Sequence, residues 1–292
     1  MKPLAIKPLN EVRAEIDGID AEIHALLMRR AELVRGVADA KAQEASNSGD
    51  QGFIAFRPGR EAEIMRTLAA RHEGPLPLRV VFRIWRELIS TATRMQGTFR
   101  VDVFGGRQPL AYWDLARSYY GSSTEMEQHA NPRDVVRRVA NDRNAVGIVP
   151  LPGPDEDGDW WQALVSGAAE TPRVVARLPF LDEPGNEATP TAFVIAQAEF
   201  DDTGDDTTLI AVSTTGDGSE GRITAKVEAA GLHAERLSVV APNVPDAPRY
   251  SLFTVPGYIR ADDPRLALLA SDEIIETVRV IGGYANPVRR ES

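Results

Sequence analysis

The sequence predicts a multi-domain protein: an all-α module of three helices, then an α/β segment, then an α+β segment with the order β-α-β-β-α-β. Apolar residues recur every three or four positions up to Gln96, the period of amphipathic helices. From Phe99 the pattern changes to the alternation of strands. We therefore divide the chain into residues 1–98, 99–200 and 201–292.

The first helix is predicted from Leu9 to about Gln43, and its apolar positions form a continuous seam along one side. The seam consists of Leu9, Val12, Ile16, Ile19, Ile23, Leu26, Leu33 and Val37. Arg30 falls on this seam, and Lys41 points roughly the same way about three turns later. Two cations on a buried stripe require an anionic partner.

Two shorter helices are predicted at 58–71 and 78–96, after a polar surface loop at 44–52. They cannot cover the distal half of a first helix about twice their length. The pattern therefore predicts a homodimer in which two first helices run side by side.

The remaining elements alternate between strand and helix patterns. We expect strands at 99–104, 145–151, 173–178, 191–197, 207–213, 234–240, 250–258 and 277–281. We expect helices at 110–120, 132–141, 160–166, 221–230 and 264–270, a loop at 181–190, and a linker in the acidic tract 199–206.

Composition narrows the function classes. The net charge is −10, and the acidity lies after residue 98, which argues against nucleic acid as a partner. The absence of cysteine and the presence of only four histidines disfavour disulfides and a zinc site. Neither a leader-like N-terminus nor an apolar run of membrane-span length is found, so we expect a cytoplasmic protein without membrane contact.

The helical module resembles the all-helical (type II) chorismate mutases over residues 9 to 97. The matching motifs are Val12-Arg13, Leu26-Leu27 with Arg29-Arg30, Ala40-Lys41, Arg60-Glu61 and the closing Gln96. The resemblance implies rearrangement of chorismate to prephenate, a one-substrate pericyclic reaction that requires no metal or cofactor.

In such a reaction the protein holds a dicarboxylate compact and stabilises charge on the ether oxygen. The resemblance implies that Arg13, Arg30 and Arg60 grip the carboxylates. It further implies that Lys41 and Gln96 donate to the ether oxygen and that Glu61 accepts from the ring hydroxyl.

Two positions depart from the family pattern: Arg57 stands where an acidic residue is common, and Ala92 stands where some members have Ser. Both remain candidate substrate-binding positions.

Helix geometry supports the dimer independently. Arg13 and Arg30 lie ~25 Å apart along a continuous helix, so they cannot share one small-molecule pocket within a chain. If both act, Arg13 reaches into the partner's pocket, as it does in the family.

The segment after residue 98 is similar to prephenate dehydratases in two motifs, Asn144 to Leu151 and Thr191-Ala192-Phe193. The residues of the dehydratase motifs that carry the chemistry are replaced. Leu151-Pro152-Gly153 stands in place of Ile-Glu-Asn, Ala192 stands in place of Arg, and residues 105–109 lack the usual glycine-rich turn. Only about ten residues separate the strands on either side of 181–190, which leaves no room for a second lobe. We expect a single-lobe remnant without dehydratase activity.

The final segment resembles an ACT domain in Val278 to Val288, and such domains commonly bind amino acids. An aromatic amino acid could act there as an effector that binds through the turn 218–222. The Glu-Ser-Arg-Pro motif that is usual in the family is absent, and residues 236–240 stand in its place. Two functions are favoured: a chorismate mutase with a regulatory or dimerising appendage, and a non-catalytic aromatic-amino-acid sensor that uses the helical module to dimerise. A working prephenate dehydratase is a third, less favoured function.

Overall fold

The computed structural model describes residues 7–48, 55–153, 158–182, 189–215, 220–241 and 247–289. Three helices open the chain: α1 (Leu9–Ser48), α2 (Pro58–Arg71) and α3 (Leu78–Gln96). The predicted helices at 58–71 and 78–96 are confirmed. Helix α1 continues to Ser48, past the predicted end near Gln43, and residues 49–54 of the predicted loop lie outside the described residues.

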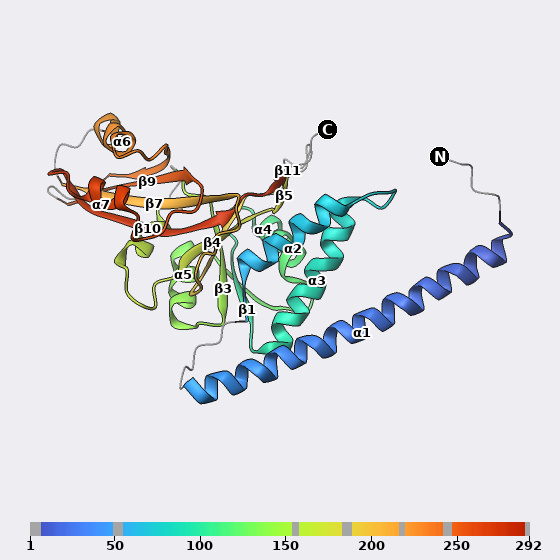
Figure 1. The fold of residues 1–292 in the computed structure, drawn as a ribbon. Helices are drawn as coiled ribbons and strands as arrows, with labels where there is room; N and C mark the ends of the chain where they lie inside the picture. Colours follow the sequence, from blue (N-terminus) through green and yellow to red (C-terminus); the bar gives the residue numbers. More distant parts are fainter. Residues whose placement is uncertain are drawn as a thin grey trace.

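Helix α1 is a long rod that contacts the rest of the molecule mainly along α3 (Figure 1). Its N-terminal half projects away from the body of the protein (Figure 1). Among the helices in the described ranges, none combines the length and apolar character that crossing a bilayer requires.

The rest of the chain builds one nine-stranded sheet in the order β2-β1-β3-β6-β4-β10-β7-β9-β8. The chain up to β6 contains β1 (Arg100–Phe104), α4 (Pro109–Tyr120), β2 (Glu125–His129), α5 (Pro132–Asn141), β3 (Ala145–Pro150), the 3-10 helix η1 (Trp160–Ser166), β4 (Arg173–Leu178), β5 (Leu181–Asp182) and β6 (Ala192–Ala196), of which β5 lies outside the nine-stranded sheet. Strands β1, β2 and β3 are parallel, whereas β6 runs antiparallel to β3 and β4.

The sequence pattern did not indicate β2. Its residues, Glu-Met-Glu-Gln-His, carry no apolar alternation because β2 is the outermost strand of the sheet and is largely exposed. Polar edge strands of this kind limit pairing with other chains, and they give no periodic hydrophobic signal.

The C-terminal part contains β7 (Asp206–Thr214), α6 (Glu220–Ala229), β8 (Glu235–Val240), β9 (Arg249–Pro256), α7 (Pro264–Ala270), β10 (Ile275–Ala285) and β11 (Val288–Arg289). The six elements from β7 to β10 follow the predicted β-α-β-β-α-β order, and their strands are antiparallel neighbours. Strand β10 also lies beside β4, where Gly282 pairs with Val174, so the sheet continues across the division proposed at 200/201.

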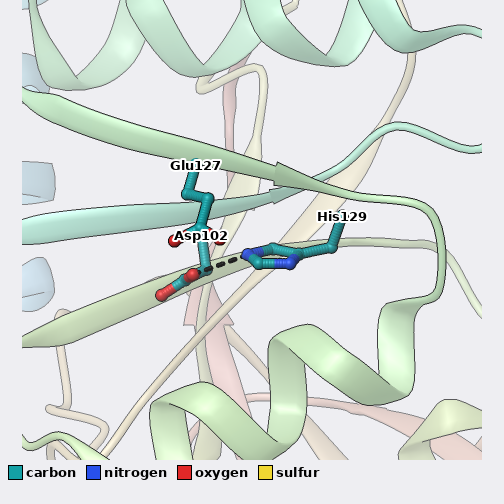
Figure 2. A group of neighbouring side chains, drawn as sticks. All are labelled: Asp102, Glu127 and His129. Atoms are coloured by element: carbon teal, nitrogen blue, oxygen red, sulfur yellow. Dashed lines mark hydrogen bonds and ion pairs between the residues drawn. The ribbon is translucent and has the colours of Figure 1, made fainter.

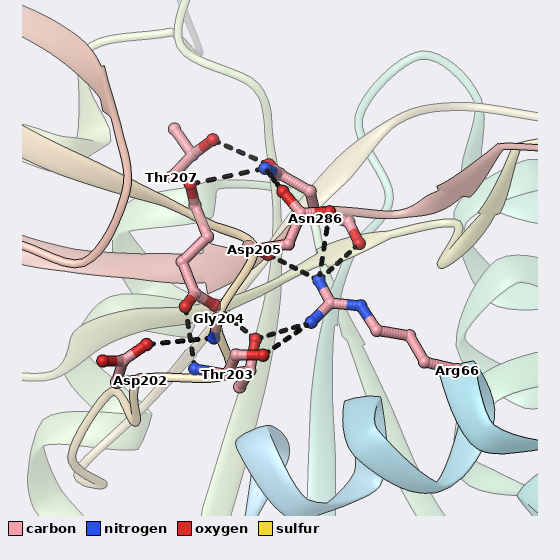
Figure 3. Close-up of polar contacts among 8 residues, drawn as sticks. Arg66, Asp202, Thr203, Gly204, Asp205, Thr207 and Asn286 are labelled. Carbon is pink, nitrogen blue, oxygen red and sulfur yellow. Dashed lines mark hydrogen bonds and ion pairs between the residues drawn. The ribbon is translucent and has the colours of Figure 1, made fainter.

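The acidic tract 199–206 forms specific hydrogen bonds that connect α2 to the C-terminal part, whereas the sequence predicted a linker. Figure 3 shows Arg66 of α2 reaching this tract. The guanidinium donates from Nη1 to Thr203 Oγ1 at 2.8 Å and from Nη2 to the carbonyl oxygen of Asn286 at 3.0 Å. Thr203 Oγ1 in turn donates to Asp206 Oδ1 at 2.6 Å, so the tract fixes α2 to the C-terminal part.

The hydrophobic cores are shared between the predicted segments. Met65 and Phe82 of the helices belong to the same buried cluster as Val101 and Leu178 of the sheet. A second cluster contains Trp161 from η1 together with residues of the C-terminal part such as Leu209 and Leu252. Helices α2 and α3 therefore obtain their core from the sheet that follows them.

Candidate functional site

Helix α1 contacts α3 through one stripe that includes Arg30. Within 25–40, the residues that are half-buried are Leu27, Arg30, Ala31, Val34 and Ala38, whose spacing is that of one helix face. Arg30 Nη1 donates to the carbonyl oxygen of Leu88 at 3.3 Å. Burial lowers the pKa of Arg30 from its ordinary value. The cation lies at the contact between the two helices.

The predicted seam of α1 is uncovered in a single chain. Its members, from Leu9 to Val37, are 37–66% exposed. The sequence predicted that this seam packs against partners, and within the chain a neighbouring stripe makes the contact instead. Arg13 is exposed on the projecting half of α1. Lys41 lies on α1, and its side chain is outside the described residues.

The cations predicted on α2 are exposed near its N-terminus. Arg57 precedes the helix, and its carbonyl oxygen accepts from the backbone N–H of Glu61 at 3.1 Å. The Arg60 guanidinium is paired with Glu63 at 2.8 Å, one turn along the helix. Pairs of this exposed kind contribute little to stability, so Arg60 can exchange its partner for a ligand at small cost.

Glu61 is buried and forms an ion pair that its sequence pattern does not predict. Its Oε2 accepts from Arg86 Nη1 at 2.8 Å, and the Arg86 side chain is only 4% exposed. The Arg86 guanidinium also lies 3.5 Å from the ring centre of Tyr119. Burial raises the pKa of Glu61 to about 7, while the nearby Arg86 charge acts in the opposite direction.

A sequence signal for Arg86 existed. Leu78, Phe82, Ile89 and Thr93 define the buried stripe of α3, and Arg86 falls on it with the same three- and four-residue steps. A permanent cation on such a stripe predicts a buried anion, which the structure identifies as Glu61.

The remaining two candidates lie together at the end of α3. Gln96 Nε2 donates to the carbonyl oxygen of Ala92 at 3.0 Å, so its amide is folded back on its own helix. Ala92 is buried at 8% exposure. A donor role for Gln96 toward a substrate therefore requires its side chain to change rotamer.

Within one chain, the described candidates do not meet in a single pocket. Arg30 contacts α3 at Leu88, whereas Glu61 contacts it at Arg86, and positions two residues apart lie on nearly opposite sides of a helix. Arg13 belongs to neither group. The geometry provides a cationic surface on α1 beside α3, and it leaves the seam of α1 open for a further element.

A second polar cluster lies on the sheet, where Figure 2 shows Asp102, Glu127 and His129 together. Their ligand-type atoms are within 4.8 Å of one another, as a metal site requires. However, Asp102 accepts from His129 Nε2 at 2.7 Å and from Arg138 Nε at 2.8 Å, and Arg138 also pairs with Glu127. Because a guanidinium already bridges both carboxylates, we assign the cluster to holding α5 on β1 and β2.

Comparison with known proteins gives a family match for the helical part. The family described as Chorismate mutase type II matches residues 12–97, which cover most of α1 and all of α2 and α3. The chain is 27% identical over 150 residues to a bifunctional chorismate mutase/prephenate dehydratase of Aquifex aeolicus, covering 50% of this chain and 39% of that protein. A protein of the same description from Pseudomonas aeruginosa is 26% identical over 148 residues, covering 51% of this chain and 40% of that protein.

The solved structure of prephenate dehydratase from Streptococcus mutans aligns with 66% of this chain and 100% of its own, with 15% identity and a TM-score of 0.48. The match spans about two fifths of the length of the two curated relatives. The match to the Chorismate mutase type II family thus covers residues 12–97, and about half of the chain is similar to bifunctional chorismate mutase/prephenate dehydratases.

Proposed function

We propose that the protein is a chorismate mutase that acts as a homodimer and rearranges chorismate to prephenate. The observation that carries this proposal is the match of a mutase family to the three helices of residues 12–97, which hold all the predicted cations. The functional division at 98/99 and 200/201 is part of the proposal, even though the hydrophobic cores cross both positions.

In the proposed mechanism, fixed cations bind and orient the substrate. Arg30 and Arg60, with Arg13 from the partner, bind the two carboxylates and hold the substrate in its compact conformer. Arg57 extends this cationic wall, and Ala92 supplies apolar contact.

Lys41 and Gln96 donate to the ether oxygen as negative charge develops there. Glu61 is proposed as the acceptor for the ring hydroxyl. Because Arg86 holds Oε2 of Glu61 on the side of α3 away from Arg30, this role requires Glu61 to leave the pair with Arg86.

The exposed seam of α1 supports the dimer. Eight large apolar side chains along one side of a helix form an apolar strip that is costly to leave in water. A second α1 packed along this strip would bury it and would bring Arg13 of one chain toward the pocket of the other.

The region after residue 98 is proposed to have lost dehydratase chemistry. Ala192, where similar dehydratases have Arg, is fully buried on β6 and pairs with Pro150 of β3. An apolar residue in a core cannot bind or protonate a substrate. The β7–β10 part is proposed as an ACT-like regulatory module with an aromatic amino acid as effector.

The alternative, a non-catalytic sensor that dimerises through the helices, is favoured by one observation. The polar groups of Glu61 and Gln96 are both engaged by protein partners.

An assay of the full chain on chorismate separates the two functions. We expect the wild type to form prephenate and Lys41→Ala to lower kcat by about 100- to 1000-fold, the cost of losing one transition-state donor. Arg35→Ala, an exposed cation on the same helix, is the matched control and should be unchanged. No turnover by the wild type would favour the sensor, and full turnover by the Lys41 variant would reject the mechanism.

Phenylpyruvate formed from added prephenate would contradict the loss of dehydratase activity.

A further inference from the structure

A large cleft lies between α3, α4 and the segment that follows β4. Its volume is about 1170 Å³, and its walls include Phe82 of α3, Leu115 of α4 and Phe180 after β4. Small-molecule sites typically have volumes of roughly 300–1000 Å³, so a small organic molecule fits with space for water. None of the predicted mutase residues is among the described residues that line this cleft.

Four arginines line the cleft, and three of them share one stripe of α3. Arg79, Arg83 and Arg86 are spaced four and three residues apart, which stacks them along one helix face. Arg117 of α4 is the fourth. Such a row of like charges on one face repels itself unless an anion lies against it.

The acidic groups lining the cleft do not balance these charges. Glu87 is used locally, because its Oε1 accepts from the backbone N–H of Ser122 at 2.8 Å, beyond the end of α4. Asp114 is the other acidic residue in the described lining. Across the described residues, neither Arg79 nor Arg83 forms an ion pair.

Arg86 lies at the inner wall of the cleft, and one of its donors is left without a partner among the described residues. Its side chain is 96% buried, its Nη1 donates to Glu61, and its guanidinium is stacked on the Tyr119 ring. Its Nη2 is buried with no hydrogen-bond partner in the part of the chain that is described. Buried donors are rarely left unpaired, and a charged donor is the most costly kind.

We propose that this cleft binds a small organic anion that joins a carboxylate to a ring. The carboxylate lies against the arginine stripe, where guanidinium groups bind it through charge-assisted hydrogen bonds. The ring lies against Phe82, Leu115 and Phe180, which bury its apolar surface. The cleft adjoins the proposed mutase residue Glu61 through the Glu61–Arg86 pair, but binding of an anion in the cleft requires no mutase activity.

Calorimetric titration of the full chain tests the proposal with three matched probes. The ring-bearing anion is 3-phenylpropionate, 3-phenylpropionamide keeps the ring without the charge, and propionate keeps the charge without the ring. We expect 3-phenylpropionate to bind at least ten times more tightly than the other two. The Lys41→Ala variant should bind it equally well, which separates this site from the mutase pocket and from the success or failure of the proposed mutase function.

Two substitutions locate the binding. Arg83→Gln removes an exposed cleft cation without touching the core and should weaken 3-phenylpropionate binding at least tenfold. Arg137→Gln on α5 removes an exposed arginine outside the cleft lining and should change nothing. Equal affinity for all three probes, no binding, or unchanged binding by the Arg83 variant would overturn the proposal. Tighter binding of sulfate than of 3-phenylpropionate would also overturn it, because a ringless anion would then be the better ligand.

Discussion

At the scale of single residues, the Glu61–Arg86 pair shows how burial changes a carboxylate. Glu61 is 7% exposed and Arg86 is 3% exposed, so water can stabilise neither charge. Burial raises the pKa of Glu61 from 4.5 to about 7, above its value in the unfolded chain. The folded protein therefore retains this proton at pH values where the unfolded chain has released it.

This difference predicts a pH dependence of stability. Between about pH 4.5 and 7 the folded state binds more protons at Glu61, so the free energy of unfolding falls as pH rises and levels off above pH 7. Glu61→Gln cannot titrate. We expect the stability of the wild type relative to this variant to fall by roughly 1–3 kcal/mol from pH 5 to 7.5. Urea unfolding of both proteins at the two pH values measures it, and a constant difference would contradict the raised pKa.

At the scale of elements, the contact between α2 and the tract 199–206 depends on one side chain. Arg66 donates to Thr203 and to the carbonyl oxygens of Asp205 and Asn286, which lie far apart in sequence. The acidic composition of the tract suggested a linker, because composition cannot show that an arginine more than 130 positions earlier lies against it.

Removing this side chain should loosen α2. We expect Arg66→Met to lower the free energy of unfolding by about 2–3 kcal/mol, because several charge-assisted hydrogen bonds are lost together. Arg60→Met on the same helix removes only an exposed pair with Glu63 and should cost less than about 1 kcal/mol. Urea denaturation of the two variants compares them directly, and equal losses would show that the Arg66 contacts add nothing.

Element positions were predictable where hydrophobic periodicity is strong, and less so elsewhere. The stripes of α2 and α3 and the apolar run of β3 gave nearly correct bounds, since each buries one continuous face. Strand β2 gave no signal because its side chains face solvent. In the candidate site, Arg30 was proposed from its place on the apolar seam and Glu61 from the resemblance to the mutase family, whereas the Glu61–Arg86 pair depends on how α2 packs on α3.

At the scale of the whole molecule, segments that the sequence separates share their cores. The sheet covers the inner faces of α2 and α3, and β10 joins the C-terminal strands to β4. Among the described residues, the seam of α1 is a continuous apolar strip that stays uncovered. The fold thus leaves this apolar surface open to a partner and places the exposed Arg13 beside it.

The proposed exchange of Arg13 between subunits makes a quantitative prediction. Arg13→Ala and Lys41→Ala should each be nearly inactive alone, because each removes one group from both pockets of the dimer. After the two variants are unfolded and refolded together in equal amounts, half of the dimers contain one chain of each kind. In such a dimer one pocket combines an intact Lys41 with an intact Arg13 from the other chain, and the second pocket lacks both. The mixture should recover about a quarter of wild-type activity.

The matched control mixes Arg30→Ala with Lys41→Ala in the same way. Both residues are assigned to the pocket of their own chain, so each pocket of a mixed dimer still lacks one group and activity should not return. Initial rates of prephenate formation decide between the arrangements. Recovery in neither mixture would place Arg13 outside the partner's pocket, and equal recovery in both would remove the assignment of Arg30 and Lys41 to one chain. Recovery in the first mixture alone follows only if the open seam of α1 is the dimer interface and carries Arg13 across it.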